Sequence, residues 1–132
     1  MVKKKIVWHK SAKICLLYIP DSGNMTITHA GTQYSFPENA DGICCWNSDK
    51  PLNYGVAIRK SDDMHDTVLH ECYHLFFRYL SDIDKEKFGA DELSRDLYCM
   101  EFMEMYEKVA GFFNKIEKQL KIEKCIKIVK KF

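Results

Sequence analysis

The hydrophobic pattern of this chain changes halfway along its length, and this change constrains the fold more than any other feature. In the first half, short runs rich in Ile, Val, Leu and Tyr alternate with turn-forming Pro, Gly, Asn and Asp. Such runs predict β-strands, because branched and aromatic side chains favour an extended backbone. The predicted strands cover residues 13–19, 25–29, 33–36, 42–46 and 54–59. We expect the second and third of these to form a hairpin around Gly31.

The second half carries a helical pattern. Asp62 and Asp63 supply an N-cap and negative charge for a first turn, so we expect a helix over about 62–80. Its apolar residues lie on two faces, which is typical of a central helix packed between a sheet and another helix. A second long helix is expected over about 90–119. The Lys-rich segment 118–132 fits either a helical extension or a last strand.

Strands followed by helices predict an α+β fold, with a small, mostly antiparallel sheet packed on two long helices. A chain of 132 residues predicts one domain over 1–132, and 46% hydrophobic residues are ample for its core. With 20 basic and 19 acidic residues, the charge balance makes a nucleic-acid partner unlikely and calls for no membrane partner. Six cysteines without a CxxC motif predict reduced thiols in a cytoplasmic protein. The oligomeric state stays open.

The segment His70-Glu71-Cys72-Tyr73-His74 lies within the first predicted helix. Residues four apart share one helix face, so His70 and His74 can bind one metal ion. Glu71 is rotated by about 100° from His70 and can hold a water there without being a ligand. This is the pattern of a zinc hydrolase helix. Coincidental spacing is the alternative, but it would place unpaired polar groups in a strongly apolar helix, at a cost in stability.

A catalytic zinc site needs a third protein ligand and leaves one position open. Glu92 and Asp96 are four residues apart on the second predicted helix, and therefore on one face. Glu92 is the natural third ligand, with Asp91 and Glu101 as rivals. Asp96, one turn further, is placed to accept the N–H of a liganding histidine and fix its tautomer. The alternative role for Asp96 is a simple salt bridge.

An HExxH followed by ExxxD on the next helix resembles the gluzincin, or thermolysin-like, class of zinc metallopeptidases. The resemblance gives His70, His74 and Glu92 the role of ligands to one zinc ion. It makes Glu71 the catalytic base and Asp96 the carboxylate behind a ligand. In size the chain is also similar to the minimal zincins of phages and mobile elements, including the ImmA/IrrE-type peptidases.

This resemblance implies a hydrolase that cleaves peptide bonds in a peptide or protein substrate, with Glu71 moving the proton. The large C-terminal domain of thermolysin-like enzymes is missing, so another group must stabilise the oxyanion. The candidate donors are Tyr98, Tyr106, Arg95 and His65. The predicted strand 54–59 is the candidate edge for an extended substrate. Two alternatives remain, a non-catalytic binding or regulatory module and a metal-dependent hydrolase of a non-peptide amide.

Overall fold

The computed structural model describes residues 1–83 and 92–130, except for the side chains of residues 92–95. These residues form an α+β fold, which confirms the class predicted from the sequence. The strands are β1 (Lys3–His9), β2 (Ala12–Ile19), β3 (Met25–His29), β4 (Thr32–Phe36), β5 (Gly42–Asn47) and β6 (Lys50–Arg59). The helices are α1 (Met64–Ile83) and α2 (Glu92–Lys130). Strand β1 is not among the predicted strands.

Four of the strands form one sheet in the order β1-β2-β6-β5, while β3 and β4 form a separate hairpin. The outer pairs β1–β2 and β5–β6 are antiparallel, and the central pair β2–β6 is parallel. In the hairpin, Ala30 and Gly31 have φ values of 51° and 81°. Two successive positive φ angles belong to the tight hairpin turn that matches the twist of the strands. The predicted hairpin is therefore confirmed.

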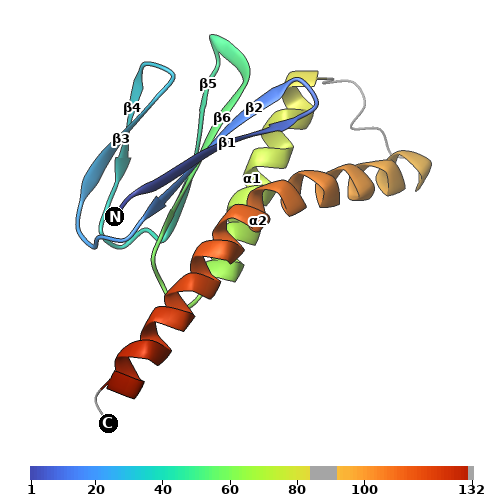
Figure 1. Cartoon of the computed structure of the whole chain (residues 1–132). Coiled ribbons are helices and arrows are strands. Elements are labelled where there is room, and N and C mark those ends of the chain that lie inside the picture. The colour runs from blue at the N-terminus through green and yellow to red at the C-terminus, as the bar shows by residue number, and fades with distance from the viewer. Residues whose placement is uncertain (84–91, 131–132) are drawn as a thin grey trace.

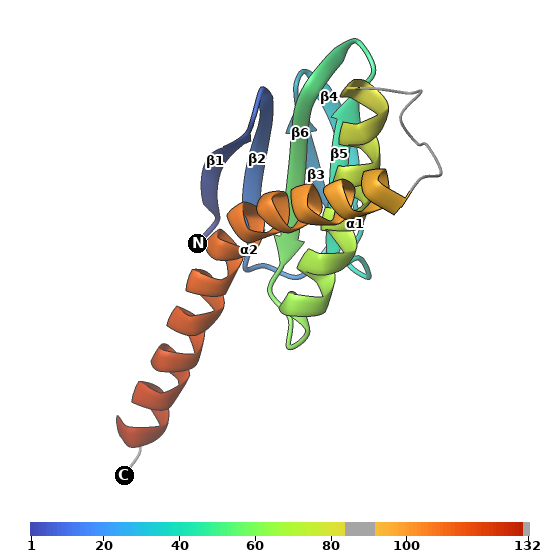
Figure 2. The same cartoon turned by 90° about the vertical axis from the view of Figure 1, so that its right-hand side faces the viewer.

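The elements stack in three layers, with α1 and α2 on one face of the sheet and the β3–β4 hairpin on the other (Figures 1 and 2). Strand β2 shows how the sequence builds these layers. Its residues Ile14 and Leu16 belong to the core under the helices, whereas Leu17 and Ile19 pack with the hairpin. This alternation follows from the two-residue period of a strand, which points successive side chains to opposite faces.

Helix α1 is the central helix that the sequence predicts, because it packs against β5, β6 and α2. Its sheet-facing side is fully buried at Val68, Cys72 and Leu75. Helix α2 covers only part of the opposite side: Tyr73 stacks on Phe102 of α2 with ring centroids 5.0 Å apart, yet Tyr73 and Phe77 are more than half exposed. His70 and His74 lie on the exposed part of this helix, at the surface of the molecule.

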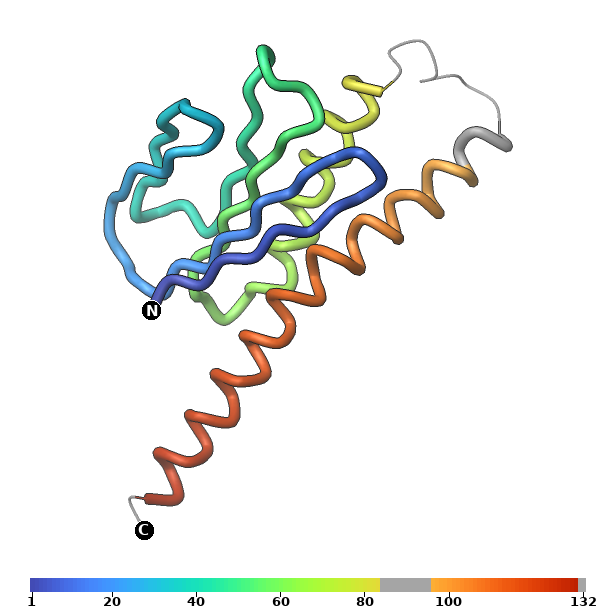
Figure 3. The backbone as a smooth tube through the Cα atoms, turned by 45° about the horizontal axis from the view of Figure 1, so that its top comes forward, coloured from blue at the N-terminus to red at the C-terminus, as the bar shows by residue number. Residues whose placement is uncertain are grey.

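Helix α2 runs well past the expected end near residue 119 and includes the Lys-rich segment through Lys130. The choice between a helix and a strand for this segment is thus decided in favour of the helix. An ion pair between Glu117 and Lys121, with Oε1 and Nζ 3.1 Å apart, links successive turns there. From residue 121 onward every described residue is exposed, and this end of α2 extends away from the sheet (Figure 3). Neither described helix is long and apolar enough to cross a membrane.

Candidate metal centre

The two histidines of the HExxH motif lie side by side on the open face of α1. Their Nε2 atoms are 3.1 Å apart, and the His70 side chain is 68% exposed. Two nitrogens that share one tetrahedral zinc ion, at Zn–N distances of ~2.0–2.1 Å, lie ~3.3 Å apart. The observed spacing therefore fits a pair of imidazoles that converge on one metal ion.

Glu71 lies at the edge of this pair and is buried, with a residue exposure of 7%. Its Oε1 atom is 4.0 Å from Nε2 of His70. Burial raises the pKa of the Glu71 carboxyl, and the neighbouring His70 and His74 offset part of that rise. A carboxylate with a raised pKa is a stronger base, which suits a group that must take a proton from water.

A shallow hollow of about 430 Å³ opens beside Glu71 between α1 and the start of β5. Its lining includes Asp41, Gly42, Thr67 and His70. Gly42 is the first residue of β5, so the strand backbone forms one wall of the hollow. The hollow gives water and a small part of a substrate access to the Glu71 carboxylate.

The residues present fit a zinc ion, because two imidazole nitrogens converge beside a carboxylate. Within residues 1–83 and 96–130, no third His, Cys, Asp or Glu joins them in a cluster suited to a metal ion. The side chain of Glu92, the predicted third ligand, lies outside the described residues, as does the rival Asp91. The backbone of Glu92 begins α2. Asp96 is exposed, and no hydrogen bond joins it to either histidine in the described part of the chain.

Glu101, the other rival for the third ligand, is engaged elsewhere. Its Oε1 atom is 3.1 Å from Nε2 of His9 and accepts hydrogen bonds from Lys10 Nζ at 2.9 Å and from the Tyr79 hydroxyl at 2.9 Å. Burial favours a raised pKa for this carboxyl, but the hydrogen bonds from Lys10, His9 and Tyr79 outweigh it and lower the pKa. Glu101 thus ties α2 to α1 and to the β1–β2 turn, and within the described residues it does not join His70 and His74 in a metal-binding cluster.

The four candidate oxyanion donors occupy different places. His65 is exposed and lines a separate hollow with Asn114 and Lys118 of α2. The Tyr106 ring stacks on Phe102 with centroids 6.0 Å apart, and burial together with the nearby Cys72 thiol raises its pKa. Tyr98 is half-buried on the same helix. The Arg95 side chain lies outside the described residues.

The prediction that residues 54–59 form the substrate-binding edge is wrong. They belong to β6, which is paired with β2 on one side and with β5 on the other. A strand with neighbours on both sides has no free backbone groups to offer. The edge strand beside α1 is β5, which packs on that helix. Gly42, at the start of β5, could have indicated this strand as the substrate edge, because a glycine in a strand often marks a close approach of another group to the backbone.

Searches against known proteins return no similarity. No protein-family model, curated protein or solved structure matches this chain. The resemblance to zincins therefore rests on the motif residues and their spacing.

Proposed function

We propose that this protein is a zinc-dependent metallopeptidase that hydrolyses peptide bonds in the cytoplasm. The observation that carries the proposal is the 3.1 Å approach of the His70 and His74 Nε2 atoms beside the buried carboxyl of Glu71. A binding helix has no need of a base at that position, whereas a hydrolase does. His70, His74 and Glu92 would hold one zinc ion, with Asp96 supporting a histidine from behind.

When bound, zinc supplies Lewis acidity, which makes water a stronger nucleophile and polarises the carbonyl under attack. Glu71 accepts the proton of the attacking water and delivers it to the leaving nitrogen. Its burial suits both steps, because a raised pKa lets the carboxyl hold the proton between them.

A peptide substrate would bind in extended form along the outer edge of β5. Arg59 N donates a hydrogen bond to Asp41 O at 2.8 Å. In the antiparallel register, the backbone N–H and C=O groups of every second residue from position 41 onward therefore point toward β6. By the same alternation, the peptide groups of Gly42 and Cys44 point away from β6. These groups can pair with an extended chain, and Gly42 places that chain beside the hollow at Glu71.

The test compares the wild type with Glu71→Gln on a diverse peptide library at neutral pH with zinc present, with cleavage read by mass spectrometry. We expect chelator-sensitive cleavage by the wild type and a loss of at least about 100-fold in the variant, the low end of a general-base contribution. Both proteins should hold equal amounts of zinc. Glu104→Gln, which changes an exposed glutamate of α2, is the matched control and should cleave normally.

The same experiment separates the alternatives. Cleavage that is unchanged in Glu71→Gln would overturn the mechanism. A wild type that binds zinc but cleaves no peptide would favour a binding or regulatory module. Hydrolysis of small non-peptide amides in place of peptides would favour a metal-dependent hydrolase of non-peptide amides.

A further inference from the structure

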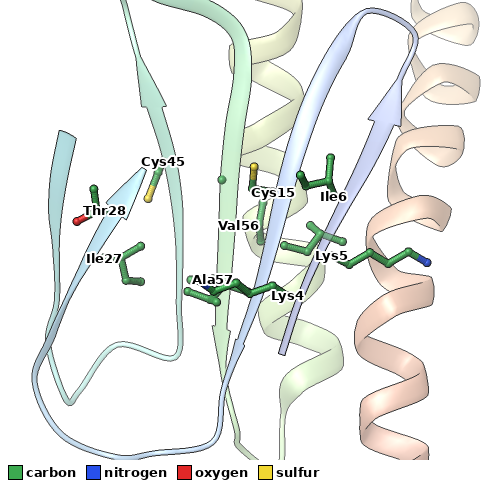
Figure 4. A pocket seen from close by; sticks show the side chains of 12 residues that line it. Lys4, Lys5, Ile6, Cys15, Ile27, Thr28, Cys45, Val56 and Ala57 are labelled. Carbon is green, nitrogen blue, oxygen red and sulfur yellow. The ribbon is translucent and has the colours of Figure 1, made fainter. Parts of the chain in front are cut away.

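A second cleft lies on the opposite face of the sheet from the HExxH helix. It has a volume of about 480 Å³ and opens between β1 and the β3–β4 hairpin. Figure 4 shows its lining, with Ile6 of β1 and Ile27 of β3 on opposite sides. Ligand pockets typically have volumes of about 300–1,000 Å³, so the cleft is of a size to hold a small molecule.

The cleft lies over an apolar floor in which Leu17 of β2 is flanked by the smaller side chains of Cys15 and Ala57. The space over Gly55, which pairs with Cys15, is taken by the buried His29, since a Cβ atom at position 55 would be 3.1 Å from Nδ1 of His29. The hairpin covers one end of the face through Phe36, which packs against Ala57. On the other side, Ile6 is left 52% exposed beside the open cleft.

The charge at the cleft is positive. In Figure 4 the Lys4 side chain lies over the floor beside Ala57, whereas the Lys5 side chain runs away from the cleft. Lys5 also lines a separate hollow that includes Phe112 and Lys115 of α2. The described lining contains no Asp or Glu, and Lys4 makes no ion pair in the described part of the chain. An apolar floor beside one uncompensated ammonium group favours a ligand with an apolar body and a single negative charge.

We propose that this cleft binds a small amphiphilic anion, with its apolar body on the floor and its carboxylate at Lys4. A second copy of the chain fits less well, because β1 carries Lys3, Lys4 and Lys5 in succession. Lysines on an edge strand oppose pairing with an identical strand through charge repulsion. The site is independent of the metal centre, since the sheet separates it from α1.

Isothermal titration of the full chain with decanoate, below the concentration at which it forms micelles, tests the proposal. We expect one site per chain. Butyrate has the same head group but a shorter chain and should bind far more weakly, because each buried methylene contributes about 0.8 kcal/mol, or about fourfold in affinity. Decyltrimethylammonium has the same chain but a positive charge and should bind at least about 10-fold more weakly. Equal binding of the decyl anion and the decyl cation would overturn the charge argument.

Two variants localise the head group. Lys4→Gln removes the ammonium group at the cleft and should weaken decanoate binding by about fivefold. This loss corresponds to the largest contribution usually measured for an exposed ion pair. Lys118→Gln removes an exposed lysine of α2, on the other side of the sheet, and should bind as the wild type does. Equal losses in both variants would show a diffuse charge effect and would reject the site.

A chemical footprint locates the apolar body without any substitution. All six thiols are free; Cys15 lines the cleft, while Cys99 and Cys125 are exposed on α2. Decanoate should slow the alkylation of Cys15 by at least about threefold when it nearly saturates the site, as measured by peptide mass spectrometry. The alkylation rates of Cys99 and Cys125 should not change. Binding by calorimetry with no protection of Cys15 would place the ligand elsewhere and overturn the proposal.

Discussion

Gly42 at the start of β5 lies directly against Glu71 of α1. A Cβ atom at position 42 would be 3.0 Å from Cγ of Glu71 and 2.7 Å from Cγ2 of Thr67. Real Cβ atoms are essentially never found as close to another heavy atom as the Thr67 contact, and the Glu71 contact is tighter than nine in ten real Cβ contacts. The backbone of an edge strand therefore buries the proposed catalytic base and fixes its position beside the histidines.

Gly42→Ala tests this packing. The added methyl group must push Thr67, Glu71 or the strand aside. A displacement of about 1 Å at a catalytic group can lower turnover by about 100-fold. We expect turnover to fall by about 10- to 100-fold, measured on the best peptide of the library. Zinc binding should be retained, because His70 and His74 lie on the exposed face of α1.

Gly111→Ala is the matched control for the glycine substitution. A Cβ atom at position 111 of α2 meets no atom within 4 Å. Alanine is favoured over glycine inside a helix by about 1 kcal/mol, so this variant should be at least as stable as the wild type and fully active. Normal turnover in Gly42→Ala would show that Glu71 does not depend on this contact.

The metal content of the purified protein tests the histidine pair. We expect about one zinc ion per chain by elemental mass spectrometry, because the proposed ligands form one site. His70→Ala and His74→Ala should each abolish binding, whereas His65→Ala, which changes an exposed histidine of the same helix, should leave it intact. Full zinc occupancy in a double variant lacking both His70 and His74 would refute the site.

A zinc titration tests the third ligand. Glu92→Ala should weaken zinc binding more than any other acidic substitution on α2, because it removes a direct ligand. Asp96→Asn should weaken it by about 10- to 100-fold, the usual effect of a carboxylate that orients a ligand. Glu104→Ala is the control and should have no effect. If Glu92→Ala matched the wild type, the third ligand would have to be another group.

The stability of the fold should depend on pH through Glu101. Its pKa is lower in the folded state than its ordinary value, so the unfolded chain binds more protons in the acidic range. Its contribution to stability is therefore complete above the ordinary pKa of a glutamate and is lost as pH falls through the lowered folded value. Urea denaturation at pH 7 and at stepwise lower pH should show this loss in the wild type.

The variant Glu101→Gln isolates this effect. Without the carboxylate, the variant should be less stable at pH 7 by about 1–3 kcal/mol, because the buried partners lose a charged acceptor. Its stability should then vary less with pH than that of the wild type. Identical pH profiles for the two proteins would assign the acid sensitivity to other carboxylates.

The local features of this protein follow from the sequence alone. Periodicity and turn residues predict the strand β2, the hairpin around Gly31 and the helix α1, because these preferences act between near neighbours in the chain. The approach of His70 and His74 also follows from the sequence, since any α-helix brings residues four apart together. The fold class follows from the order of these segments.

Contacts between distant segments were decided only by the tertiary structure. Strand β1 begins with three lysines, so its sequence lacks the pattern of a strand. It forms a strand because it pairs with β2. The place of β6 inside the sheet, the packing of Gly42 on Glu71 and the hydrogen bonds of Glu101 join residues far apart in sequence. Such contacts depend on which strands pair and which faces meet, and these are set by the burial of apolar surface across the whole chain. No local pattern carries that information.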